Sequence, residues 1–134
     1  MTNQQSTKQV IVMRRDLGMS KGKIGAQAAH AAMSFITRKL DPCSPLFTYR
    51  PEPMKLPAIT HWLNESFKKV VLWVESADEL HEVYLAAMRR NMIVHRITDN
   101  GDSEFKGVPT TTCIAIGPDW DEAFVGLTDH LPSR

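Results

Sequence analysis

The sequence predicts an α/β fold, namely a single three-layer α/β/α domain with a mixed, mostly parallel four-stranded sheet. Four short apolar runs rich in β-branched residues alternate with segments whose apolar residues recur at helical spacing. Their order is strand, helix, strand, helix, strand, strand, helix, which is typical of helices covering both faces of one sheet. The length of 134 residues is that of one domain.

The chain opens with a polar segment, a strand and a long helix. Residues 1–8 are polar and are expected to form a flexible tail, so the domain is placed at residues 9–134. Residues 10–13 read V-I-V-M, as a buried strand should. After a polar turn, Ser20 is suited to cap a helix that reaches about Leu40.

A proline-rich connection occupies the middle of the chain. Residues 41–57 hold five of the eight prolines, which predicts an extended loop without regular structure. A short helix over 58–64 and a second buried strand over 70–74 are expected to follow. The segment 76–90 is predicted to be helical, because it begins with the Ser-x-x-Glu spacing of a capping box.

The last third contains two strands and a closing helix. A third strand is expected over 93–98, and it leads into the turn cluster D-N-G-D. A fourth strand over 111–117 is predicted to stop at Pro118, and Asp119 is suited to cap a final helix.

Composition excludes several classes of protein. The net charge of +1 argues against a generic polyanion binder, yet residues 1–40 hold seven basic residues and one acidic residue. That asymmetry indicates either an anionic partner or a solvated basic helix face. A membrane span needs about 18 apolar residues in a row, and the sequence has no such run. Cys43 and Cys113 form no paired motif, and no signal segment is evident, so a reducing cytoplasm is the expected location.

Common cofactor motifs do not match. Residues 18–23 read G-M-S-K-G-K, which has one residue too few for a nucleotide phosphate loop, and Ile24 stands where that loop needs a hydroxyl for magnesium. The five histidines show no metal-ligand spacing with each other or with the cysteines. We therefore expect neither a metal nor an organic cofactor.

Polar residues of unusual placement lie in residues 19–30. Lys21 and Lys23 fall in the first helical turn, where cations oppose the helix dipole but suit a phosphate beside free backbone N–H groups. Gln27 and His30 extend the same helix face. The alternative is a pair of exposed lysines on an ordinary helix.

A second candidate segment covers residues 99–112. Asp99 follows the third strand, and ligand sites in α/β sheets lie beyond the carboxyl ends of parallel strands. The carboxylate is therefore a candidate acid–base group, and hydroxyls that can position water are those of Ser103, Thr110, Thr111 and Thr112. An Asx-turn with ordinary polar neighbours is the alternative.

Taken together, the two segments resemble the type II peptidyl-tRNA hydrolases. The opening V-I-V-M-R-R-D-L-G-M-S-K-G-K-I-G-A-Q-A-A-H-A-A is similar to the opening of that family almost residue for residue. K-V-V-L-W-V, S-A-D-E-L, T-C-I-A-I-G-P and the ending L-T-D-H-L are similar in order and spacing, so the resemblance extends over residues 9–131.

The resemblance implies an α/β esterase that releases the peptide from the 3′ end of tRNA with activated water, without metal or cofactor. The catalytic positions that it implies are Lys23, Asp99, Ser103 and Thr112. Contacts to the tRNA or the peptide are expected from Arg14, Arg15, Lys21, Gln27 and His30. The sequence leaves open whether the chain acts as a homodimer.

Two departures from the family pattern keep other functions open. The family often has D-A-G-R-T at the turn, whereas this chain reads D-N-G-D-S, so Asp102 stands at an arginine position. A non-catalytic RNA-binding or protein-interaction module on the same fold is one alternative, and a hydrolase of small esters or amides is another. The loop 41–57 is longer than the family suggests and is expected to be a rim over the cleft or an interface.

Overall fold

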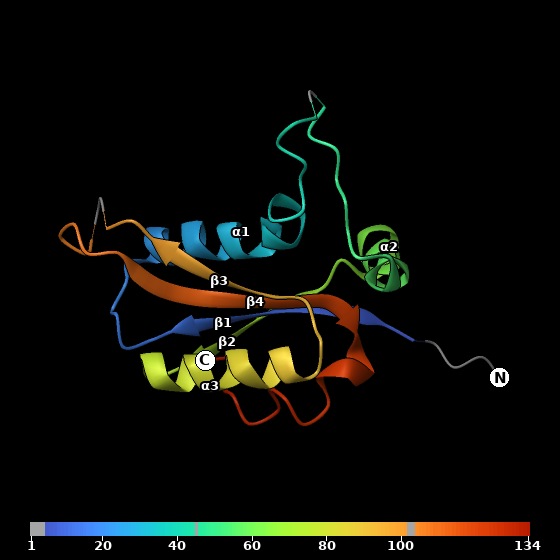
Figure 1. Ribbon diagram of the computed structural model, residues 1–134. Helices are drawn as coiled ribbons and strands as arrows, with labels where there is room; N and C mark the ends of the chain where they lie inside the picture. The colour runs from blue at the N-terminus through green and yellow to red at the C-terminus, as the bar shows by residue number, and fades with distance from the viewer. Residues whose placement is uncertain (1–4, 45, 102–103) are drawn as a thin grey trace.

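A four-stranded sheet separates α1 from α3 in the computed structural model, which describes residues 5–44, 46–101 and 104–134 (Figure 1). The strands are β1 (Thr7–Arg14), β2 (Lys69–Val74), β3 (Val94–Asp99) and β4 (Thr110–Trp120). The helices are α1 (Lys21–Thr37), α2 (Leu56–His61) and α3 (Ala77–Arg89), with short helical segments η1 (Pro53–Lys55), η2 (Trp62–Ser66) and η3 (Asp121–Phe124). The predicted α/β class is confirmed.

The pairing within the sheet corrects one part of the prediction. The strand order is β2-β1-β4-β3, and β1 pairs with β2 in parallel, while β4 is antiparallel to both β1 and β3. The sheet is therefore mostly antiparallel rather than mostly parallel. The physical reason is that no crossover helix separates β3 from β4, and a short connection returns a chain antiparallel. Since β4 is the reversed strand, the carboxyl ends of β1, β2 and β3 still share one edge.

Strand alternation divides the core into two layers. Along β1, Ile11 and Met13 face α1, whereas Val10 and Val12 face α3, and all four are almost completely buried. Burying such side chains contributes about 1.5–3 kcal/mol each. The helices that the sequence predicted on each side of the sheet are held there by these alternating apolar residues.

The two strands that pair at the N-terminal side are longer than predicted. β1 already begins at Thr7, which is fully buried, so Thr7 and Lys8 belong to the sheet and not to a flexible tail. Thr7 pairs with Trp120 and Lys8 with Asp119, so β4 continues past Pro118 instead of ending there. Proline is tolerated there because the register shifts between Lys8 and Val10, so its missing N–H costs no ladder bond.

The closing helix is shorter than predicted. After Trp120 the chain forms only the four-residue segment η3, and Trp120, not Asp119, precedes its first residue. Asp119 is occupied instead in the sheet extension, where its carboxylate accepts a hydrogen bond from the Trp120 N–H at 2.8 Å. Extra strand pairing thus replaces the expected helix cap.

The proline-rich segment forms a ribbon that rises from the C-terminal end of α1 (Figure 1). Its base is closed by a bridge between Leu40 and Tyr49 and by an ion pair between Arg50 and Asp41 at 3.2 Å. Helical structure already resumes at Pro53, so only the first part of 41–57 is irregular. Because the ribbon leaves α1 at the end opposite Lys23, it does not cover the site around Lys23, as a rim over the cleft would. No helix in the described ranges is long and apolar enough to cross a membrane.

Candidate active site

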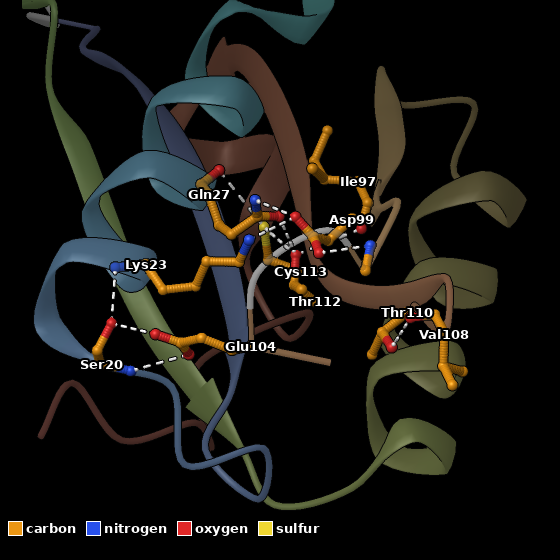
Figure 2. Close-up of polar contacts among 11 residues, drawn as sticks. Ser20, Lys23, Gln27, Ile97, Asp99, Glu104, Val108, Thr110, Thr112 and Cys113 are labelled. Carbon is orange, nitrogen blue, oxygen red and sulfur yellow. Dashed lines mark hydrogen bonds and ion pairs between the residues drawn. The ribbon is translucent and has the colours of Figure 1, made fainter. Parts of the chain in front are cut away.

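The N-terminus of α1 meets the carboxyl end of β3 and the start of β4, and four of the predicted site residues meet there, namely Lys23, Gln27, Asp99 and Thr112 (Figure 2). Ser20 caps α1 as predicted, since its side chain accepts a hydrogen bond from the Lys23 N–H at 3.2 Å. The helix ends at Thr37, three residues before the expected Leu40. Its first turn has two lysines and no acidic residue within the fully described helix, so α1 presents positive charge at its positive dipole end.

Lys23 and Asp99 form the central contact. The Lys23 Nζ lies 2.6 Å from the Asp99 Oδ1, and the two side chains are only 13% and 10% exposed. The Lys23 ammonium, and with it the Gly101 N–H that donates to Asp99 Oδ2 at 2.9 Å, holds the pKa of the Asp99 carboxyl below its ordinary 3.8. Asp99 is therefore an ionised carboxylate at neutral pH.

Gln27 links this ion pair to the start of β4. Its side-chain Oε1 accepts a hydrogen bond from the Thr112 hydroxyl at 2.5 Å, and its Nε2 faces the Asp99 Oδ1 at 3.5 Å. Gln27 and Thr112 are both buried, at 2% and 0% exposure. Since Thr112 uses its hydroxyl proton on Gln27, the amide is turned so that its N–H₂ faces the carboxylate.

The burial of Thr112 changes its expected role. The sequence suggested that its hydroxyl holds water or substrate directly, but a side chain with 0% exposure cannot touch either. Its hydroxyl instead donates to Gln27, whose amide N–H₂ faces Asp99. Ser103, the other hydroxyl expected in the catalytic set, lies outside the described residues, as does Asp102.

Two residues of the site were not singled out from the sequence. The Glu104 carboxylate accepts hydrogen bonds from both the N–H and the hydroxyl of Ser20, which ties the loop after β3 to the N-terminus of α1. The Phe105 ring lies 5.7 Å from the Lys23 Nζ. An acidic residue in a loop is a weak signal, but a carboxylate near a helix N-terminus is the arrangement that the helix dipole favours.

Among the predicted binding residues, Lys21 and His30 lie on the same side of the molecule as the ion pair. Lys21 is exposed in the first turn of α1. His30 is exposed one turn beyond Gln27, and its charge contributes to lowering the pKa of Asp99.

Arg14 and Arg15 are placed differently from this group. Arg14 forms a two-point ion pair with Asp16, at 2.7 and 3.1 Å, and its neighbours include residues of α3 on the opposite face of the sheet. Arg15 binds Glu75 at 2.9 Å and stacks on Trp73. The basic rim expected from residues 1–40 is thus divided, and two of its arginines already have carboxylate partners.

The chemistry available here is that of a carboxylate and an ammonium. The site's thiol, Cys113, is buried next to Thr112, and burial raises the pKa of Cys113 to about 11, so it is neutral and a poor nucleophile. Within the described ranges, no group of three or more His, Cys, Asp or Glu residues could hold a metal ion. An arrangement of this kind suits water-dependent hydrolysis near an anionic group.

Comparison with known proteins identifies the class to which this fold and site belong. The family model described as peptidyl-tRNA hydrolase PTH2 matches residues 7–133. A peptidyl-tRNA hydrolase of Sulfurisphaera tokodaii is 40% identical over 126 residues, which is 94% of this chain and 93% of the relative. One of Methanocaldococcus jannaschii is 38% identical over 125 residues, covering 92% of this chain and 96% of the relative. The chain belongs to the PTH2 family.

Proposed function

We propose that this protein hydrolyses the ester that joins a peptide to the 3′ end of tRNA. The observation that carries the proposal is the Lys23–Asp99 pair at the N-terminus of α1, in a chain whose family and relatives are peptidyl-tRNA hydrolases. Peptidyl-tRNA is a product of ribosomes, and this supports a cytoplasmic place of action.

Asp99 is proposed to orient the attacking water. Its lowered pKa keeps it ionised but makes it a weak base, so holding the water by a hydrogen bond is its main contribution. The water oxygen adds to the ester carbonyl, the ester C–O bond breaks, and the proton ends on the 3′ oxygen of the tRNA. Gln27, held by Thr112, limits the movement of the carboxylate.

Lys23 is proposed to stabilise the negative charge that develops on the carbonyl oxygen. Its ammonium is positioned before substrate arrives, because Asp99 and the first helical turn hold it. A preorganised donor of this kind typically contributes about 10²–10³ in rate. Gln27 and Thr112 support this arrangement without contacting the substrate.

The tRNA end is proposed to bind at the first turn of α1. Lys21 is exposed there, at the positive end of the helix dipole. His30 extends the same side. Arg14 and Arg15 are left out of the proposed contacts, because Arg14 lies among residues of α3 on the opposite face of the sheet and Arg15 stacks on Trp73 of β2.

The test is hydrolysis of a purified N-acetylated aminoacyl-tRNA. We expect release of the N-acetylated amino acid by the wild type and losses of about 10²–10³ in kcat for Lys23→Met and Asp99→Asn. Lys68→Met is the matched control, since Lys68 is exposed at the start of the β2 region, at the other end of the sheet. Wild-type binding of tRNA without hydrolysis would instead favour a non-catalytic RNA-binding module.

A second variant tests the phosphate contact separately. Lys21→Met should raise KM and reduce the dependence of KM on salt, because one cation fewer meets the tRNA phosphates, while kcat stays near that of the wild type. An unchanged salt dependence would remove Lys21 from the tRNA contacts and leave the hydrolytic proposal intact.

A further inference from the structure

The outer edge of β3 turns backbone groups away from the sheet next to the proposed catalytic carboxylate. β3 is the last strand of the sheet. The Ile93 carbonyl accepts from the Gly117 N–H of β4, so alternation along the strand turns the backbone groups of Arg96 outward. The register shift between Ile97 and Thr98 leaves its extra residue, Thr112, on β4, so the alternation along β3 continues and Thr98 also faces outward. The Arg38 side chain confirms this direction, since it donates to the outward carbonyl of Arg96 at 2.9 Å.

A groove runs along this edge, between β3 and α1. Figure 1 shows how these two elements are arranged. Its volume is about 320 Å³, and its α1 wall is formed by His30, Met33, Ser34, Thr37 and Arg38. It begins at Thr98, the residue before Asp99. Among the described residues of the lining, Arg38 is the permanent cation and lies at the end farther from Asp99, and the others are apolar or neutral apart from His30.

The proline-rich segment closes the far end of this edge. Ile93, just before β3, and His95, the second residue of β3, lie with Tyr49 and Pro51 around a separate small pocket. The open part of the edge therefore extends from Asp99 back to about Arg96. At about 3.3 Å per residue this is roughly 10 Å, the length of three residues of extended chain.

We infer that the β3 edge binds the peptide part of peptidyl-tRNA as an added strand. The inference rests on the proposed function, because it takes the ester to lie at Asp99. A peptide whose carboxyl end is at Asp99 and whose amino end points toward Arg96 runs parallel to β3. Its backbone would form hydrogen bonds with the Thr98 N–H and C=O, and one of its N–H groups would replace the Arg38 side chain as the donor to the Arg96 carbonyl.

The chemistry of the groove favours a peptide over the nucleotides of the tRNA. Pairing through main-chain groups is independent of side chains, which suits an enzyme whose substrates carry any peptide sequence. Phosphates need several cations. Among the described residues that line the groove, Arg38 is the only permanent cation, and the Arg96 guanidinium lies over the Tyr84 ring on the α3 side of the sheet. Lys21, at the first turn of α1, is better placed for the tRNA. The two parts of the substrate would then leave Asp99 in different directions.

The first test varies the substrate and keeps the wild-type enzyme. We expect kcat/KM to rise about tenfold from an N-acetyl-alanyl-tRNA to an N-acetyl-trialanyl-tRNA, since two hydrogen bonds contribute about that factor. Extension to five residues should add nothing, because the open edge ends near Arg96. N-methylalanine should then be placed at one position of the tripeptide at a time. At the position whose N–H faces the edge it should abolish the rise in kcat/KM, and at the adjacent position, whose N–H points away from the edge, it should leave the rise unchanged.

These outcomes separate the inference from the function on which it rests. Failure to hydrolyse any of the substrates would reject the proposed function. Hydrolysis of all of them with equal kcat/KM, or equal effects of N-methylation at both positions, would overturn the added strand and leave the hydrolase proposal standing.

The second test locates the peptide by amide hydrogen exchange. A trialanyl group joined by an amide to 3′-amino-adenosine serves as the non-hydrolysable probe. It should slow the exchange of the Arg96 and Thr98 amides, and the same adenosine without the peptide should not. Slowing by the peptide-free probe would assign the groove to the nucleotide, and absence of slowing by either probe would place the peptide elsewhere; both results overturn the inference.

Discussion

Thr112→Val removes one buried hydroxyl and almost no volume, so it isolates the hydrogen bond that orients Gln27. In the wild type the Thr112 Oγ1 donates to the Gln27 Oε1 at 2.5 Å. Valine leaves that oxygen without its donor in a side chain that is 2% exposed. The Gln27 amide is then free to turn, and its N–H₂ no longer faces Asp99 reliably.

The expected loss of stability follows from this burial. An unsatisfied buried acceptor costs about 1–3 kcal/mol. Unfolding entropy of about 2.1 cal/mol/K per residue over 134 residues converts that cost to a fall in Tm of about 4–11 °C. Activity should fall roughly tenfold to a hundredfold in kcat, because Asp99 loses a restraint on its position. Thr112→Ser retains the hydroxyl and should keep most of the activity.

The assay combines thermal unfolding with hydrolysis of N-acetylated aminoacyl-tRNA. Thr110→Val is the matched control, because the Thr110 hydroxyl donates to the Val108 carbonyl at the surface of the same strand, and it should change stability by less than about 0.5 kcal/mol. Gln27→Leu combined with Thr112→Val should cost less than the sum of the two single changes. Additive costs, or full activity of Thr112→Val, would refute the positioning role.

Three further predictions concern charge, thiol reactivity and a helix cap. Because Lys23 lowers the pKa of Asp99, the acid limb of the kcat/KM profile should lie below pH 3.8 and should move to higher pH in Lys23→Met; an acid limb that does not move would contradict the pairing. The lowered pKa also stabilises the fold at pH values above the unfolded pKa, and this stability should disappear as the pH falls through the folded pKa. In the native protein at pH 8 a thiol reagent should modify the exposed Cys43 and spare Cys113, whereas both should react in denaturant; rapid native reaction at two thiols would show that Cys113 is accessible. Ser76→Ala removes the cap of α3 and should cost about 1 kcal/mol, or about 4 °C in Tm, unless the cap contributes nothing in solution.

Local features of the fold followed from the sequence because short-range physics sets them. The apolar runs predicted the four strands, and residues 10–13 are buried in β1 as predicted. Ser20 and Ser76 were expected as helix caps, and both side chains accept the bonds that such caps require. In the Ser-x-x-Glu sequence, however, the Glu79 carboxylate binds the Glu75 N–H, so only one half of the expected capping box forms as predicted.

The candidate site was partly visible in the sequence for the same reason. Lys23, Gln27 and His30 share a helix face because helical spacing puts them there. Their relation to Asp99, 76 residues after Lys23, came only from a resemblance to a family. No local spacing predicts that an ammonium and a carboxylate so far apart in sequence lie 2.6 Å from each other.

The sequence by itself therefore determined the four strands and the helices capped by Ser20 and Ser76, since these depend on neighbours within a few residues. Only the tertiary structure decided that β4 enters between β1 and β3 and reverses most of the pairing. That insertion brings Thr112 beneath Gln27 and leaves β3 as an open edge ending at Asp99. These arrangements depend on contacts between distant segments, which no local pattern of residues specifies.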